Sequence, residues 1–144
     1  MKPTFFTLPA LALLLSGCFE TTDCTLIGCA DQLTVHLLGP PDSSEVSGMI
    51  TVGGHAFVVD CEGTSDPEVL CTGDAITIQL AEGLGGGAVQ WSLSSDGRDS
   101  GGGGGGYAGD GTVTPDWEVS QPNGPDCGPT CTSAEMTVEL LGTP

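Results

Sequence analysis

Positively charged residues are nearly absent from this sequence. Its 144 residues include 19 acidic side chains but only Lys2 and Arg98 as bases, so the formal net charge is −17. A surface of this sign is repelled by phosphate backbones and by anionic lipid headgroups. The composition therefore argues against nucleic-acid partners and against electrostatic membrane binding.

Large aromatic side chains are also scarce. After Phe19 the only aromatic residues are Phe57, Trp91, Tyr107 and Trp117. No segment of useful length shows the apolar periodicity of a helix. A small core with few large side chains needs covalent reinforcement, and we expect the cysteines to supply it.

Recognisable catalytic motifs are missing as well. The sequence has no Gly-x-Ser-x-Gly elbow, no His-Glu-x-x-His motif and no phosphate-binding glycine loop. His36 and His55 have no Ser, Cys or carboxylate at a catalytic spacing, so we expect them on the surface or on an edge strand. Asp96, Asp99 and Asp110 follow no known calcium-loop spacing. We predict a protein without catalytic residues, metal ligands or cofactors. A hydrolase is the less favoured alternative, because 19 acidic residues can contain an unmarked carboxylate pair.

Residues 1–17 have the pattern of a signal peptide. Lys2 precedes an apolar segment at 5–15, whose eleven residues fall short of the roughly 20 that span a membrane as a helix. The motif Leu-Ser-Gly-Cys follows at 15–18 and resembles the lipobox of bacterial lipoprotein precursors. The resemblance implies cleavage before Cys18 and a diacylglyceryl group on its thiol. The alternative is an ordinary secretory signal, with Cys18 as a free thiol or a disulfide partner.

The six other cysteines make an even set, which predicts three disulfides in an oxidising compartment. They are Cys24, Cys29, Cys61, Cys71, Cys127 and Cys131. Cys61 and Cys71 flank a short loop that would place them on adjacent strands. The other four either close locally or tie the start of the domain to its end, and both arrangements stay open. Zinc binding is disfavoured, since structural zinc sites use tighter spacing and reduced thiolates.

The lipid hypothesis also places the domain. Residues 18–23 form a tether and residues 24–144 form one domain. Six residues extend at most about 20 Å, so the domain lies close to the bilayer and meets any protein partner there. Phe19 follows the lipid site where Asp would signal retention under enterobacterial sorting rules, which favours the outer membrane. Lipid is the only plausible membrane attachment for so acidic a domain.

Alternating apolar and polar residues predict a series of short β-strands. The segments at 33–38, 75–80, 89–94 and 112–119 each follow this period of two. Seven or eight evenly spaced strands favour an all-β fold, an antiparallel β-sandwich of the Ig-like or transthyretin-like kind stapled by disulfides.

One hairpin can be predicted in detail. Gly53-Gly54 suits a two-residue turn that pairs Ile50 with Phe57 and Val52 with His55. Cys61 then falls on the apolar face of that strand.

Two segments are predicted to be loops, and two others resemble each other. The glycine-rich stretch 94–111 is expected to be a mobile loop, and it is the candidate site of an alternative function as a small-ligand or calcium-binding module. Residues 121–131 are expected to be rigid because prolines, glycines and two cysteines define their turns. LTVHLLG at 33–39 resembles MTVELLG at 136–142. This similarity is either a duplication or two terminal strands that enter the core from a disulfide-fixed corner.

The whole chain is similar to the small cysteine-rich lipoproteins predicted from myxobacterial-type genomes. The motifs that carry the similarity are LSGC at 15–18, CTLIGC at 24–29 and SQPNGPDCGPTC at 120–131. The resemblance implies location and fold type, and it implies no activity. We therefore expect an envelope lipoprotein with a structural or protein-binding role, anchored through the lipid on Cys18.

Overall fold

The computed structural model describes residues 28–39, 45–96 and 105–142. Within these ranges the chain forms ten β-strands and no α-helix, and no helix there is long and apolar enough to cross a membrane. The strands are β1 (Asp31–Leu38), β2 (Val46–Val52), β3 (His55–Asp60), β4 (Val69–Thr72), β5 (Ala75–Leu80), β6 (Val89–Ser95), β7 (Tyr107–Val113), β8 (Glu118–Ser120), β9 (Cys131–Glu139) and β10 (Leu141–Gly142). The predicted signal peptide, Cys18 and the tether 18–23 lie outside the described residues.

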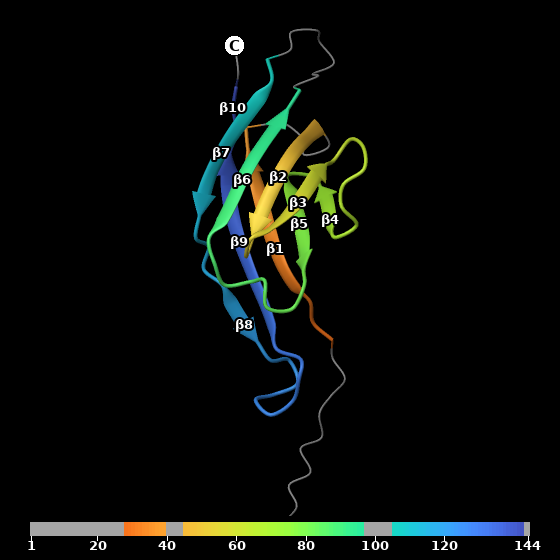
Figure 1. The fold of residues 1–144 in the computed structure, drawn as a ribbon, viewed down its shortest axis with the longest axis vertical. Helices are drawn as coiled ribbons and strands as arrows, with labels where there is room; N and C mark the ends of the chain where they lie inside the picture. Colours follow the sequence, from red (N-terminus) through yellow and green to blue (C-terminus); the bar gives the residue numbers. More distant parts are fainter. Residues whose placement is uncertain (1–27, 40–44, 97–104, 143–144) are drawn as a thin grey trace, which may run out of the picture.

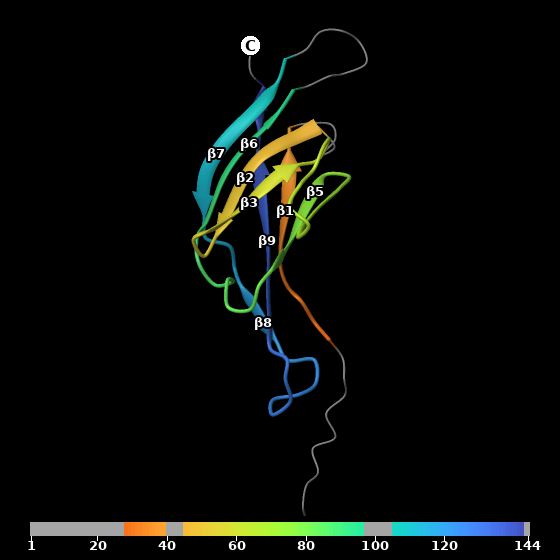
Figure 2. The same cartoon turned by 45° about the vertical axis from the view of Figure 1, so that its right-hand side comes forward.

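The strands form two stacked five-stranded sheets (Figures 1 and 2). Sheet A has the order β4-β5-β1-β9-β8, and sheet B has the order β10-β7-β6-β2-β3. Every pairing is antiparallel except that of β1 with β9, which is parallel. The predicted antiparallel β-sandwich is confirmed, with one parallel pair at the centre of sheet A.

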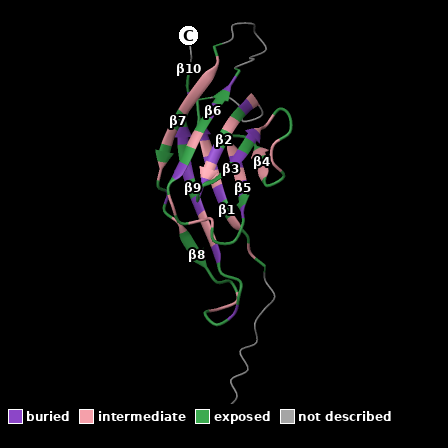
Figure 3. Cartoon of the chain, viewed as in Figure 1, coloured by how far each residue is buried: buried purple, intermediate pink, exposed green. Residues whose placement is uncertain are grey.

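The core follows from the alternation in the sequence. In β1 the buried side chains are Leu33, Val35 and Leu37, and in β5 they are Ile76, Ile78 and Leu80. These positions are buried, while the positions between them in the same strands are intermediate or exposed, and Figure 3 colours the strands by this burial. Successive side chains of a strand lie on opposite faces, so a period of two in the sequence becomes one buried face.

The predicted hairpin is confirmed in its register. Ile50 pairs with Phe57 and Val52 pairs with His55. Gly53 and Gly54 have φ angles of 57° and 82°, as the two central residues of a type I′ turn require. Both values lie in the left-handed region, which glycine enters without steric cost.

The loop predicted at 94–111 is shorter than expected, because strands β6 and β7 extend into it from both sides. Residues 94–95 belong to β6 and pair with residues 107–108 of β7, while residues 109–111 of β7 pair with residues 91–93 of β6. The glycines that suggested low complexity in 107–111 are at alternate positions of a strand, Gly109 and Gly111. Residues 97–104 of the predicted loop lie outside the described residues.

The single strand predicted at 112–119 is two strands in different sheets. β7 ends at Val113 in sheet B, and β8 begins at Glu118 in sheet A. The buried Pro115 lies between them. Proline has no N–H to donate to a ladder, so pairing stops there and the chain crosses between the sheets.

The two similar segments lie side by side. β1 and β9 run parallel, with Leu33 opposite Ala134 and Val35 opposite Met136. Both strands bury one face against sheet B and both follow a disulfide-linked cysteine. Both segments thus enter the core from the disulfide-linked corner, and the choice between a duplication and two similar core strands stays open.

Candidate functional site

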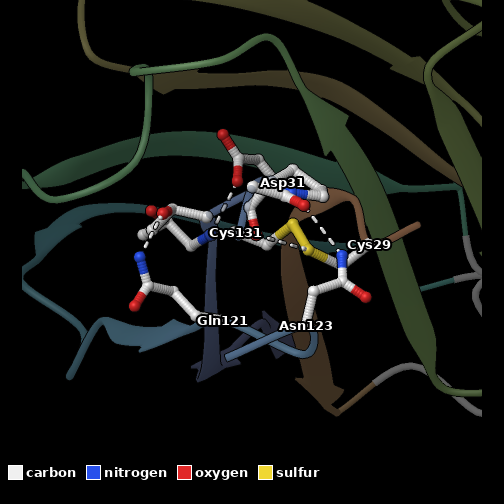
Figure 4. The surroundings of a disulfide bond; sticks show 9 residues. Cys29, Asp31, Gln121, Asn123 and Cys131 are labelled. Atoms are coloured by element: carbon white, nitrogen blue, oxygen red, sulfur yellow. Dashed lines mark hydrogen bonds between the residues drawn. A yellow bond between two sulfur atoms is a disulfide. The ribbon is translucent and has the colours of Figure 1, made fainter. Parts of the chain in front are cut away.

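The lower end of the sandwich in Figure 1 is a cross-linked corner formed by the starts of β1 and β9 (Figure 4). Cys29 and Cys131 form a disulfide whose Cα atoms are 6.0 Å apart. Beside it, the backbone N–H of Thr132 donates to Asp31 Oδ1 over 2.6 Å. The charge-assisted bond and the disulfide together join the first described strand to the last long one. Of the arrangements predicted for these cysteines, the structure has the one that ties the start of the domain to its end.

The segment that leads into this corner is held by its own side chains. Gln121 Nε2 donates to Thr130 Oγ1 over 2.9 Å, and Asn123 Nδ2 donates to the Gly128 carbonyl over 2.8 Å. Cys127 is 3% exposed and disulfide-bonded. These contacts agree with the predicted turns at 121–131. The predicted partner candidate Cys24 lies outside the described residues.

The second disulfide closes one side of the sandwich. Cys61 and Cys71 are joined with their Cα atoms 5.7 Å apart, as predicted from the loop between them. Cys61 directly follows β3 and Cys71 lies in β4, and these strands are not hydrogen-bonded neighbours, since β3 is the edge of sheet B and β4 is the edge of sheet A. The bridge therefore links the two sheets, which is a correction to the expected placement on adjacent strands.

The loop between these cysteines also covers the edge of β3. The N–H of Val58 donates to Asp66 Oδ2 over 2.7 Å, and the N–H of Asp60 donates to Ser65 Oγ over 2.8 Å. The N–H of Asp66 returns a bond to the Val58 carbonyl. These side chains thus accept hydrogen bonds from backbone N–H groups of β3 that would otherwise be free to pair with a strand of another molecule.

The two histidines lie where surface residues were predicted. His36 is on the outer face of β1, with Nε2 3.8 Å from Glu135 Oε2. His55 begins the edge strand β3, and its ring lies edge-on to the ring of Phe57 with the ring centroids 4.8 Å apart. Within the residues that the structure describes, no group of three His, Cys, Asp or Glu side chains is placed to hold a metal ion.

The surface is negative throughout the described ranges. Of the 19 acidic residues, all except Glu20, Asp23, Asp42 and Asp99 lie within these ranges, whereas Lys2 and Arg98 both lie outside them. A field of one sign favours encounter with cationic partners over anionic ones.

Two shallow hollows mark the outer faces of the sheets. The hollow on sheet B has a volume of about 450 Å³ and is lined by outward side chains that include Met49, Gln90 and Asp110. The hollow on sheet A has a volume of about 400 Å³ and lies where β8 begins beside β9. Three carboxylates, those of Asp116, Glu118 and Glu135, line the second hollow together with Gln32, Ser133 and Ala134.

Reasoning from the sequence missed the packing role of the β7 glycines. Trp91 pairs with Gly111 across β6 and β7, and its ring also extends alongside Gly109. A Cβ atom on either glycine would come within 3.1 Å of the indole. The alternation of glycine with larger residues in YAGDGTV is the sequence signal for this packing. It can be interpreted only when Trp91 is known to be the neighbour of these glycines.

No protein-family model matches the chain, and no curated protein or solved structure is significantly similar to it.

Proposed function

We propose that the protein is a lipid-anchored envelope lipoprotein whose disulfide-linked β-sandwich has a structural or protein-binding role. The observation that supports this most is the cross-linked corner at Cys29 and Cys131. Cys18 stands only eleven positions before Cys29 in the sequence. A lipid on Cys18 would thus hold the domain by the most strongly reinforced end of its sandwich.

The proposal includes a third disulfide between Cys24 and Cys127. Cys127 is disulfide-bonded, and Cys29, Cys61, Cys71 and Cys131 already have partners. With Cys18 carrying the lipid, Cys24 is the cysteine left for it. Peptide mapping of the unreduced protein tests this pairing directly, and a Cys18–Cys127 peptide would contradict both the pairing and the lipid.

The anchor is tested by intact mass and by fractionation of the cells that make the full chain. We expect the membrane fraction to contain protein cleaved before Cys18 with the added mass of acyl chains, and density fractionation to place it with the outer membrane. Cys18→Ala should lose the added mass and the membrane association, because one thiol carries the attachment. Thr22→Ala, four residues further on, is the matched control and should keep both. Wild-type protein of unmodified mass in the soluble fraction would refute the anchor.

A small-ligand module is the second candidate, and the hollow on sheet B is the observation that favours it. Its volume of about 450 Å³ is within the range of small-molecule sites, and Asp110 is the single charged residue in its lining. Asp110 is also one of the three aspartates of segment 94–111 that could offer oxygens to calcium. Calorimetry of the full chain with millimolar calcium chloride tests whether this module binds calcium. Heat of binding that is lost in Asp110→Asn would support calcium binding, and absence of heat would refute it.

A further inference from the structure

One strand edge of the sandwich is left open within the described residues. β8 pairs only with residues 131–133 of β9. From Ala134 onward, β9 has β1 on one side and no described strand on the other. Glu139, at the far end, lies close to β7, since a Cβ atom on Gly109 would be 3.0 Å from its carbonyl oxygen. The open stretch is therefore Ala134–Val138.

This edge differs from the edge of β3. There, Asp66 and Ser65 bond the backbone N–H groups of Val58 and Asp60 and so occupy the edge. No described side chain bonds the backbone of Ala134–Val138 in the same way. Protein edges are usually short, bulged or covered, because a row of free N–H and C=O groups is a template for another strand. An open edge beside a covered one is a candidate place for strand addition.

We propose that the open edge of β9 binds an extended, positively charged segment of another protein as an added strand. The hollow on sheet A begins at this edge, since its lining includes Ser133, Ala134 and Glu135. The carboxylates of Asp116 and Glu118 line the same hollow. A Lys or Arg side chain of the added strand would enter it and meet all three carboxylates.

The alternation of β9 specifies the partner further. Ser133, Glu135, Thr137 and Glu139 occupy outward positions, whereas Ala134, Met136 and Val138 are buried. Directly opposed residues of neighbouring strands share one face of the sheet. Basic residues are therefore expected at every second position of the partner, with small apolar residues between them.

A second copy of this chain does not fit the edge. The described residues contain neither Lys nor Arg, so a copy that paired edge to edge would bring the carboxylates of Glu135 and Glu139 near those of the other copy with no cation between them, and would place them directly opposite each other in the register centred on Thr137. Like charges directly opposite each other destabilise strand pairing. Charge complementarity thus selects a different, cationic chain. The inference deepens the protein-binding role proposed above and does not require the lipid.

The test uses the full-length protein and a fluorescent eight-residue peptide of alternating Arg and Val with blocked ends. We expect saturable binding, and amide hydrogen exchange of Ala134–Val138 should slow on binding. A Glu-Val peptide should not bind. Two further Arg-Val peptides carry N-methyl groups on odd or on even residues, which leaves their charge unchanged. One of these two should bind at least tenfold more weakly, because strand addition needs the N–H groups that face β9.

Two pairs of charge-removing substitutions distinguish binding at this edge from general attraction to the negative charge of the protein. Glu118→Gln with Glu135→Gln should weaken binding about tenfold. Glu68→Gln with Asp74→Asn removes the same charge beside β4, at the opposite edge of sheet A, and should change binding less than twofold. Equal weakening by both pairs, equal binding of all three Arg-Val peptides, or unchanged exchange at Ala134–Val138 would each refute the added strand. The mass of the same sample reports acylation, so failure of the anchor and failure of this binding are read separately.

Discussion

The indole ring of Trp91 fills the space that a side chain on Gly109 would need. A Cβ atom on Gly109 would lie 3.0 Å from two ring carbons of Trp91 and 3.0 Å from the carbonyl oxygen of Glu139. Gly109 is therefore needed because it leaves room for the Trp91 ring and for the backbone of β9 beside β7. Its conformational freedom is not what the position requires.

This packing makes Gly109→Ala destabilising. Alanine is ordinarily the better residue in a strand, but here its methyl group must displace a backbone carbonyl or a partly buried ring, and we expect a loss of about 1–2 kcal/mol in the free energy of unfolding. Gly87→Ala is the matched control, since a Cβ atom there meets nothing within 4 Å. The control should change stability by less than about 0.5 kcal/mol in chemical denaturation. Equal effects of the two substitutions would contradict the packing role of Gly109.

The covered edge of β3 gives a second prediction. Asp66→Ala removes the acceptor of the Val58 N–H, so we expect a loss of about 1 kcal/mol in the free energy of unfolding. The freed edge should also promote concentration-dependent association, which sedimentation measures. Glu68→Ala removes the same charge from an exposed neighbour and should do neither. If both variants associate equally, reduced charge is the cause and the edge cover is not.

The disulfides give a third prediction, through the loops that they close. Removing Cys61 and Cys71 as a pair should cost about 3 kcal/mol, as expected for a short loop. Cys29 and Cys131 are separated by 102 residues, for which loop closure alone gives about 4.7 kcal/mol. If Cys24 and Cys127 also form a disulfide, that bridge already closes the long loop. The Cys29–Cys131 disulfide then closes only a further loop of about ten residues, so removing Cys29 and Cys131 should cost about 3 kcal/mol.

A double-mutant cycle on the oxidised proteins measures this coupling. Removing Cys24, Cys29, Cys127 and Cys131 together should cost more free energy of unfolding than the sum of the losses when each disulfide pair is removed separately. The long loop opens only when both bridges are gone. Additive losses in guanidinium denaturation would mean that the bridge of Cys127 does not close the same long loop.

Local alternation explains which parts of the fold were predictable. In β1 and β5 one face is buried, so the period of two is written directly in residues 33–38 and 75–80. The hairpin at Gly53-Gly54 was equally local, since turn residues and register depend on a few neighbouring positions.

The errors came from contacts between distant residues. β7 looked like a flexible segment because its glycines are explained only by Trp91 on another strand. The cysteine spacing favoured the pairing of Cys61 with Cys71, but the assignment of their strands to different sheets has no local signal. The open edge of β9 was unpredictable for the same reason: it depends on β8 being three residues long.

The parallel pairing of β1 with β9 has a consequence for the order in which the molecule is made. β1 is the first described strand to be synthesised, and its partner β9 is the last long one. Until residues 131–139 have been synthesised, the centre of sheet A has a gap and the corner disulfide has one cysteine. Such distant pairings form slowly, since a long loop must close first. A nascent chain of this protein therefore cannot complete its sandwich before residues 131–139 have been added, and β1 stays without its parallel neighbour until then.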